Sequence, residues 1–454
     1  MRNPLVLWLV LAAIVLAEYY GYQAVRTATQ HWGPGARRGA AVAYWLLTVG
    51  VWALAFWAGS TRQTGNTVLK SYLMSLPLLL LGAKLLMLLP LLLEDLTRLG
   101  RWGVGAATRP AGSVGEAIPR SEFLAKLVVL LPLLLEDVTR AGRWAAGRFT
   151  APTGSPGQAI PRSTFVARLA LGLAAVPFGA LIWGMLKGAT DYKVRRLTLK
   201  FPNLPSAFDG FKVLQISDLH TGSFASTEPL RRAVALINAQ NADLILMTGD
   251  LVNNVATEVE PHIPALAGIR SALPIFSSLG NHDYGDYVPW PNPAAKRANL
   301  ERLMANHAKI GWTLLNDTSH TIERGGDKIA VLGVQNWSSH LNFPKHGNLP
   351  KAHAASGDAP FKILLSHDPS HWDAEVRHYP DIDLTLSGHT HGMQFGVNLP
   401  FLKWSPVQYV YKQWAGLYEQ GRQRLYVNTG LGYLGFPGRV GFLPEITVFE
   451  LRRG

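Results

Sequence analysis

Five short polar segments in the second half of the chain carry side chains that can bind metal ions. In order they are Asp218-Leu219-His220, Gly249-Asp250, Gly280-Asn281-His282-Asp283, His367-Asp368 and Gly388-His389-Thr390-His391. Carboxylate, imidazole and amide ligands without sulfur suit hard to borderline divalent cations. Two such cations about 3.5–4 Å apart can bridge a hydroxide and clamp a phosphoryl group during in-line displacement. The five segments together therefore predict a two-metal hydrolytic site.

Each polar segment directly follows a short apolar run rich in branched residues, which is typical of a β-strand. These runs are Lys212–Ser217, Asp243–Thr248, Ile275–Leu279, Lys362–Ser366 and Asp383–Ser387. In α/β folds, ligands bind at the carboxyl ends of strands, so these five ends are expected to converge on one site. In extended backbone, residues i and i+2 point the same way, which would aim Asp218 with His220, and His389 with His391, at a shared centre. Sharp turns out of the strands are expected at three glycines, Gly249, Gly280 and Gly388.

Further strands and helices are predicted around these segments. The additional strands are Lys328–Val334, Leu425–Asn428 and Ile446–Leu451, and the helices are Thr227–Ala239 and Pro293–Lys309. Alternation of strands and helices predicts an α/β layered domain over residues 189–454.

The five segments resemble the motifs of the calcineurin-like metallophosphoesterases, and the resemblance extends over roughly Lys212–Leu451. It implies a two-sheet β-sandwich flanked by helices, with two divalent metal ions (Mn, Fe or Zn) and hydrolysis of phosphate esters. It also implies that Asp218, His220 and His391 bind one metal ion and that Asn281, His367 and His389 bind the other. Asp250 would bridge the two ions, and His282 would contact the phosphate and protonate the leaving oxygen.

One position departs from the pattern of that family. Many members carry an acid three residues after the bridging aspartate, where it pairs with the catalytic histidine, but this chain has Asn253. An amide can orient an imidazole, yet it does not stabilise the protonated ring as a carboxylate would. The proton-donating role of His282 is therefore the part of the resemblance that this sequence supports least.

Residues 1–188 are predicted to form a helical transmembrane region. Four apolar segments approach the roughly 20 residues that a membrane span requires: Leu5–Val25, Ala40–Ala58, Tyr72–Leu93 and Leu169–Leu186. This region has 18 Lys and Arg against 7 Asp and Glu, whereas residues 189–454 have 25 against 23. The excess positive charge lies beside the apolar segments, so membrane lipids with anionic headgroups are the expected partner and nucleic acid is not. The chain has no cysteine, which excludes disulfides and thiolate ligands.

A tandem duplication occupies about residues 84–165. The sequence from Leu88 recurs from Leu130, and the sequence from Glu116 recurs from Gln158, both at a separation of 42 residues. We interpret it as a repeated membrane hairpin or surface helix, since two copies are too few for a solenoid. If this segment does not cross the membrane, its arginines place residues 189–454 outside the cell; if it crosses once, they lie in the cytoplasm.

Two further stretches leave alternatives open. Residues Gln394–Tyr418 are rich in large apolar and aromatic side chains, which either fill the core as a β-hairpin or form a lipid-facing lip beside the metal site. The loop Asn336–Pro360 carries His340, His346 and His353, interpreted as solvated loop histidines, with metal ligation as the alternative.

The leading interpretation is an integral membrane protein of a bacterial inner (plasma) membrane that hydrolyses a phosphodiester or pyrophosphate. The membrane-associated branch that the chain resembles includes enzymes acting on lipid precursors such as UDP-2,3-diacylglucosamine, in lipid A biosynthesis, so a lipid-linked substrate is favoured. A soluble nucleotide or a phosphoprotein is the alternative substrate. A membrane scaffold or transporter with a regulatory phosphoesterase-like domain is the alternative of another class, with Glu18, Lys84 and Lys126 as its candidate intramembrane residues.

Overall fold

The computed structural model of the chain describes residues 4–60, 69–77, 79–84, 162–340 and 343–454. The chain divides into two compact units, which are described separately. The first comprises residues 1–65 and 72–181, and the second residues 66–71 and 182–454. The division falls within the last predicted membrane segment, a few residues before the boundary expected at residue 188.

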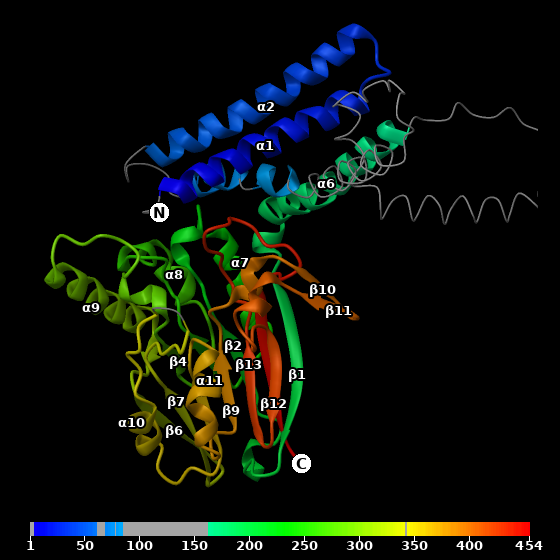
Figure 1. Cartoon of the computed structure of the whole chain (residues 1–454). Coiled ribbons are helices and arrows are strands. Elements are labelled where there is room, and N and C mark those ends of the chain that lie inside the picture. Colours follow the sequence, from blue (N-terminus) through cyan, green and yellow to red (C-terminus); the bar gives the residue numbers. More distant parts are fainter. Residues whose placement is uncertain (1–3, 61–68, 78, 85–161, 341–342) are drawn as a thin grey trace, which may run out of the picture. The chain divides into compact units, whose positions relative to one another are not determined.

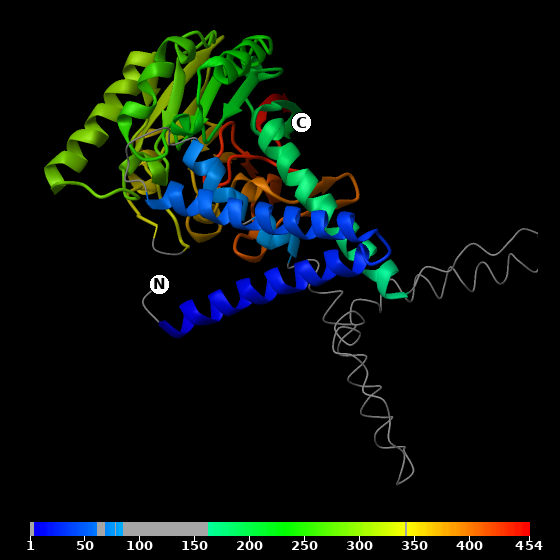
Figure 2. The ribbon, with the colours of Figure 1, turned by 90° about the horizontal axis from the view of Figure 1, so that it is seen from above.

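The first unit contains long apolar helices. Helices α1 (Pro4–Ala28) and α2 (Pro34–Ser60) form a helical hairpin (Figures 1 and 2). Residues 72–77 and 79–84 are helical, and most of α6 (Arg162–Leu186) completes the described part. Within the described residues, two helical segments are long and apolar enough to cross a membrane, Pro34–Ser60 and Arg168–Thr190. They coincide with the second and fourth predicted spans. Nearly all of the predicted duplication, including Lys126, lies outside the described residues.

A buried polar cluster joins three helices of the first unit. Glu18 of α1 forms an ion pair with Lys84, whose side chain is buried, while that of Glu18 is mostly buried. The Glu18 carboxylate also accepts from the Trp52 indole N–H at 3.3 Å and from the Tyr44 hydroxyl at 3.1 Å. Lys84 in turn donates to the Thr48 hydroxyl at 3.1 Å. The two charges therefore satisfy each other inside the helical unit.

The second unit is a sandwich of two six-stranded sheets (Figure 1). The first sheet has the order β1-β14-β2-β3-β4-β5, with bounds Lys193–Phe201, Glu445–Arg453, Lys212–Ile216, Leu244–Thr248, Ile275–Ser278 and Trp312–Leu314. The second has the order β12-β13-β9-β8-β7-β6, with bounds Gly416–Gln420, Gln423–Val427, Leu384–Ser387, Lys362–Leu365, Asp327–Gly333 and Thr318–Arg324. Strands β2 to β5 are parallel to one another, and so are β7, β8, β9 and β13. A small antiparallel hairpin, β10 (Val397–Leu399) and β11 (Leu402–Trp404), projects from the sandwich.

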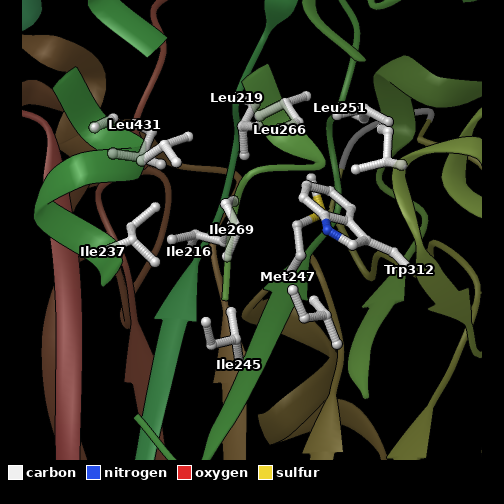
Figure 3. Close-up of a cluster of buried hydrophobic side chains, with 14 of the residues drawn as sticks. Ile216, Leu219, Ile237, Ile245, Met247, Leu251, Leu266, Ile269, Trp312 and Leu431 are labelled. Carbon is white, nitrogen blue, oxygen red and sulfur yellow. The ribbon is translucent and has the colours of Figure 1, made fainter. Parts of the chain in front are cut away.

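Both faces of the central strands are buried, which explains their continuous apolar sequences. In β3, Leu244 and Leu246 face the second sheet, whereas Ile245 and Met247 face the helices, because side chains alternate along a strand. Figure 3 shows the helix side, where Ile237 of α7 packs against β2 and β3. The helices that flank the two sheets are α7 (Glu228–Asn238), α8 (Ile263–Leu266), α9 (Pro293–Ile310), α10 (Leu349–Ala355) and α11 (Ser370–Ala374).

The predicted sandwich flanked by helices is confirmed, and each predicted strand and helix of this unit is present within a few residues of its expected bounds. The β10–β11 hairpin lies within Gln394–Tyr418, where a β-hairpin was one of the two alternatives. The strands that were not predicted are β1, β5, β6 and β12. Most of them are edge strands or lie beside an edge, where only one neighbour or one buried face constrains the sequence, so a weak apolar pattern suffices.

Candidate active site

The five polar segments meet where the carboxyl ends of both sets of parallel strands come together. Asp218, Asp250 and Asn281 follow β2, β3 and β4 of the first sheet, and His367 and His389 follow β8 and β9 of the second. Hydrogen bonds tie the two sheets together at this edge: Gln215 Nε2 of β2 donates to the carbonyl of Ser387 at the end of β9, at 2.9 Å. The expected convergence of five strand ends on one site is therefore observed.

Asp218, His220 and His391 form the first ligand group, and each offers one ligand atom within 4.8 Å of the others. Nε2 of His391 lies 3.2 Å from Asp218 Oδ1 and 3.1 Å from His220 Nε2. All three side chains are buried. Two imidazole nitrogens and a carboxylate oxygen that converge in this way match the donor set that a divalent cation requires.

Asp250, His367 and His389 form the second ligand group by the same criterion. His367 Nε2 lies 3.0 Å from Asp250 Oδ2, and the Asn281 amide oxygen lies 2.8 Å from His389 Nδ1. The two groups are adjacent, because Asp250 Oδ2 is also 3.5 Å from His220 Nε2 of the first group. The structure thus brings all seven predicted ligands into one cluster, with Asp250 between the two groups.

A hydrogen bond on the far side of the His367 imidazole turns its other nitrogen toward the ligand groups. His367 Nδ1 donates to the Thr248 carbonyl at 2.7 Å, so Nε2 faces Asp250. Nε2 of His367 is buried, and although Asp250 Oδ2 lies 3.0 Å from it, the two atoms do not form a well-aligned hydrogen bond. A buried nitrogen without a partner is costly unless a ligand completes it, so the residues fit a bound cation at this point.

The backbone of the ligand segments is strained. Five of the predicted ligands have left-handed φ angles: Asp218 (49°), His220 (46°), Asp250 (58°), His389 (70°) and His391 (53°). Such a conformation costs on the order of 1 kcal/mol or more at a non-glycine residue and tends to occur at functional sites. Convergence of the i and i+2 pairs is therefore achieved by left-handed turns, and not by the extended backbone that the sequence suggested.

The three predicted glycines act mainly by having no side chain. Only Gly249 has a positive φ, of 81°. A Cβ atom on Gly280 would lie 2.2 Å from Asp250 Oδ1, and one on Gly388 would lie 2.1 Å from Asp218 Oδ2. Close approach of the ligand carboxylates to the neighbouring backbone therefore requires glycine at both positions.

His282 is held by a backbone group. Its Nδ1 lies 2.7 Å from the carbonyl oxygen of Asn253, and its backbone N–H donates to Asp250 Oδ1 at 2.9 Å. The Asn253 side chain turns elsewhere and donates to the Ser223 hydroxyl at 2.9 Å. The absence of an acid at position 253 therefore does not remove the hydrogen-bond acceptor for His282.

A half-buried glutamate, Glu258, fixes the turn that presents this carbonyl. The Glu258 carboxylate accepts the backbone N–H groups of Asn253 (2.6 Å), Asn254 (3.2 Å) and Val255 (3.3 Å). Burial raises the pKa of Glu258, while the three N–H groups and nearby His282 oppose this shift. A Cβ on Gly222 would lie 2.5 Å from the Glu258 carboxyl group, so its position also depends on that glycine.

Aromatic side chains surround the second ligand group, and sequence reasoning did not assign them to the site. The Tyr411 hydroxyl lies 2.8 Å from His389 Nε2 and donates to Asp368 Oδ2 at 3.2 Å. Tyr287 packs on the His282 ring at a centroid distance of 4.3 Å and accepts from Asn281 Nδ2 at 2.7 Å. That bond turns the Asn281 oxygen toward His389. No spacing signal marks either tyrosine, although Tyr411 lies in the aromatic stretch that the sequence made conspicuous.

The three loop histidines have other neighbours. His346 stacks on Tyr284 at 4.2 Å, His353 pairs with Asp381 at 2.8 Å, and His340 lies edge-on to Tyr411 at 4.8 Å. Neither ligand group includes any of them. Only His340 lies near the site, through its contact with Tyr411.

Electrostatics keep the buried carboxylates of the site ionised. Burial opposes the charge on Asp218 and Asp250, but the neighbouring histidines, His391 and His367 first among them, hold the pKa of each carboxyl below its usual range. Burial likewise opposes protonation of His367, yet Asp250 and Asp218 outweigh it and raise the pKa of His367 to about 10. A buried, negatively charged pocket of this kind attracts cations.

Comparison with known proteins agrees with this geometry. Residues 211–393 match the calcineurin-like phosphoesterase family, and residues 1–127 and 121–189 match the transmembrane domain of a calcineurin-like phosphoesterase. The uncharacterized metallophosphoesterase YkuE of Bacillus subtilis is 33% identical over 295 residues, which cover 61% of this chain and 94% of YkuE. Phosphodiesterase YaeI of Escherichia coli is 29% identical over 53% of this chain and 82% of its own length.

A vertebrate relative shares the combination of a membrane region and this catalytic unit. The transmembrane protein with metallophosphoesterase domain of Danio rerio is 28% identical over 279 residues, and the match spans 60% of each chain. Together with the apolar helices of the first unit, these matches establish a membrane protein. The chain belongs to the calcineurin-like metallophosphoesterases with an N-terminal transmembrane domain, and it is a metal-dependent hydrolase of phosphoric esters.

Proposed function

We propose that this enzyme hydrolyses a phosphodiester or pyrophosphate bond at two divalent metal ions held by the seven clustered ligands. The observation that carries the proposal is the adjacency of the two ligand groups, whose facing atoms, His220 Nε2 and Asp250 Oδ2, lie 3.5 Å apart. In this proposal Asp218, His220 and His391 hold one ion, and Asn281, His367 and His389 hold the other. Asp250 contributes to both.

The residues of the chain would then act as follows. When bound, the two ions supply Lewis-acid polarisation of the phosphate and an activated hydroxide. Asp250 holds the backbone of His282 through its 2.9 Å hydrogen bond, which positions that ring beside the ligand groups. With Nδ1–H donated to the Asn253 carbonyl, His282 keeps Nε2 to contact the phosphate and to exchange a proton with the leaving oxygen.

The substrate proposed is a lipid-linked phosphate ester of the UDP-2,3-diacylglucosamine type, in the inner membrane of a bacterium, which would place the enzyme in lipid A biosynthesis. Support comes from the apolar helices that precede the catalytic unit and from the related bacterial phosphodiesterase. Manganese is the metal proposed first, since carboxylate, amide and imidazole ligands suit it, with iron and zinc as alternatives. The functional boundary proposed between membrane region and catalytic domain lies at residues 188 and 189.

The test is a Mn²⁺-supplemented assay of the purified full-length protein on lipid-linked pyrophosphates and on bis(p-nitrophenyl) phosphate. We expect metal-dependent turnover, and a loss of roughly 1,000-fold or more in Asp250→Ala because its carboxylate serves both ions. Metal content should fall from two ions per chain in parallel. Asp358→Ala is the matched control, because its side chain is exposed and pairs only with Lys328 among the described residues.

Three outcomes separate the alternatives. Turnover of lipid-linked substrates well above that of nucleotides and phosphopeptides supports the proposed substrate class. The reverse preference supports a soluble substrate. No metal-dependent turnover on any phosphate ester in the wild-type protein would refute the hydrolytic function and leave the membrane scaffold or transporter.

A further inference from the structure

The β10–β11 hairpin and the turn after it expose apolar side chains to solvent. Phe401 is 84% exposed and Tyr409 is 76% exposed. The apolar tip, as we name it, consists of Leu399, Phe401, Leu402, Tyr409 and Val410, all of which are at least 47% exposed. Soluble surfaces seldom gather large apolar side chains in this way without a partner.

The base of the hairpin is well packed, so a buried cluster holds the apolar tip in place. Val407, Tyr411, Trp414 and Phe442 form a buried cluster beneath it. Lys403 of β11 donates to the Ala415 carbonyl and places its ammonium 4.8 Å from the centre of the Trp414 ring. In Gln394–Tyr418, some aromatic side chains therefore fill a core, as in the first alternative, and others point outward, as in the second.

The segment before the hairpin is joined to the end of helix α6 within the second unit. Gly396 donates to the Val440 carbonyl at 3.0 Å, and Val440 donates to the Gln394 carbonyl at 2.8 Å. Arg439 then donates to the carbonyl of Gly184, in the last turn of α6, at 3.1 Å. Two consecutive residues thus connect the root of the hairpin to the helix end.

Two glycines, Gly184 and Gly188, allow the end of α6 to lie close to residues 439 and 440. A Cβ atom on Gly184 would lie 2.6 Å from Val440 Cγ2, and one on Gly188 would lie 2.1 Å from the Arg439 carbonyl oxygen. Any larger residue would push the helix end away from residues 439 and 440. The hairpin root is therefore linked through residues 439 and 440 to the end of α6, the last apolar helix.

That helix supplies the argument for the partner. Residues 168–190 are apolar enough to cross a membrane, and Trp183 and Leu186 beside the junction are 64% and 72% exposed. Exposed apolar residues at the end of a spanning helix lie at the lipid interface. Because residues 439 and 440 link the hairpin root to this end, a lipid surface is the partner nearest to the apolar tip.

We propose that the apolar tip inserts into the lipid interface and holds the rim of the active site at the membrane surface. Its last residue, Val410, precedes Tyr411, whose hydroxyl lies 2.8 Å from the site residue His389. The tip would therefore place the ligand groups beside the headgroups, with its side chains roughly 5–10 Å deep, as for other interfacial elements. The proposal rests on the membrane helix and not on the identity of the substrate.

The absence of cysteine allows a direct test in the full-length protein. Phe401→Cys and Tyr409→Cys would each be labelled with the fluorophore NBD in phosphatidylcholine/phosphatidylglycerol nanodiscs, with or without doxyl-labelled phosphatidylcholine. Gln420→Cys is the matched control. It is exposed and lies at the β12–β13 turn, whose pairing with β13 places it at the opposite edge of the sheet from the site. Thermal unfolding of each variant checks the fold.

We expect blue-shifted emission at positions 401 and 409, with quenching by doxyl lipid at least about threefold stronger than at position 420. Having two labelled positions covers the case in which one variant does not fold. Equal or weaker quenching at both tip positions in folded protein would overturn the proposal. Since the measurement involves no turnover, it can fail while the proposed hydrolase activity stands, and the reverse also holds.

Discussion

His282 illustrates how a side-chain role can pass to the backbone. The amide at position 253 had suggested a weakened catalytic histidine, because a carboxylate usually occupies that place. The structure instead sets the Asn253 carbonyl 2.7 Å from His282 Nδ1, and Glu258 fixes the turn that carries this carbonyl. Orientation of the His282 ring therefore depends on Glu258, which lies five positions after Asn253.

The side chain of Asn253 is expected to contribute little to catalysis. In Asn253→Ala the carbonyl that holds His282 remains, so kcat and KM on a soluble diester should stay within about twofold of wild type. The lost hydrogen bond is the one to Ser223, which lies behind the turn. Steady-state kinetics decide the matter, and a drop in kcat of a hundredfold would show that the amide itself acts on His282.

Glu258 is expected to act as a positioning residue for His282. In Glu258→Gln the amide cannot accept all three backbone N–H groups, so the turn and its carbonyl shift; a misplacement near 1 Å costs about 100-fold in rate. The loss should be in kcat, and larger for alkyl esters than for p-nitrophenyl esters, which need no proton on the leaving oxygen. The exposed Glu228→Gln is the control.

A general structural defect would lower both ester classes equally. Equal losses in Glu258→Gln would therefore contradict the positioning role. Recovery in Glu258→Asp of part of the alkyl-ester rate, with the leaving-group preference restored, would support it.

The seven ligands could be predicted because each belongs to a residue type with metal chemistry and follows a strand end in a fixed order. The surrounding residues could not be predicted in the same way. A backbone carbonyl leaves no trace in the sequence, and Tyr287 and Tyr411 reach the site from loops whose path no local pattern reveals. The roles of Gly280 and Gly388 also became clear only from the atoms they approach.

Among the helices of the first unit, the Glu18–Lys84 pair links α1 to the segment 69–84, with Thr48 of α2 between them. The sequence presented these residues as candidates for a transport path. Their mutual pairing, completed by hydroxyl and indole groups, accounts for both charges as contacts that hold helices together. Such pairs are costly to break, because the partner that remains is a buried charge.

Lys84→Met is therefore expected to destabilise the protein by about 3–5 kcal/mol, because Glu18 loses its counter-charge. The double variant Glu18→Gln/Lys84→Met should recover most of that loss. Thermal unfolding of full-length protein in detergent measures both effects, with the exposed Lys200→Met as control. A double variant no more stable than Lys84→Met alone would contradict the pairing.

The central strands could be predicted because both of their faces are buried, as in β3, where every residue from Leu244 to Thr248 is buried. Strand β1 could not, since five of its nine residues are exposed and it pairs only with β14. The left-handed turns at the ligands were equally hidden, because Asp and His adopt this backbone only in a minority of cases and nothing in the sequence singles out Asp218 or His220 for it.

In the catalytic unit, the last strand, β14, joins the first strand, β1, to the rest of the first sheet. Strand β14 lies between β1, to which it is parallel, and β2, to which it is antiparallel. Its fully buried side chains include Ile446, Phe449 and Leu451. Their burial is worth about 5–9 kcal/mol, which is comparable with the net stability of a typical domain.

Deletion of residues 445–454 should therefore prevent the catalytic unit from folding. Limited proteolysis of the full-length and shortened proteins in detergent would show a resistant fragment only in the former. Deletion of Gly454 alone is the control, because it removes no residue of β14. A shortened chain with the protease resistance of the wild type would mean that β1 and β2 do not need β14.

The position of β14 also has a consequence for biosynthesis. Strand β1 begins at Lys193, whereas its partner begins at Glu445, about 250 residues later. At a translation rate of 5–20 residues per second, β1 would wait roughly 10–50 s without its neighbour. During that interval an unpaired edge strand is tethered to a helix that is already entering the membrane. Synthesis of β14, and not membrane insertion, is thus the step that completes the first sheet.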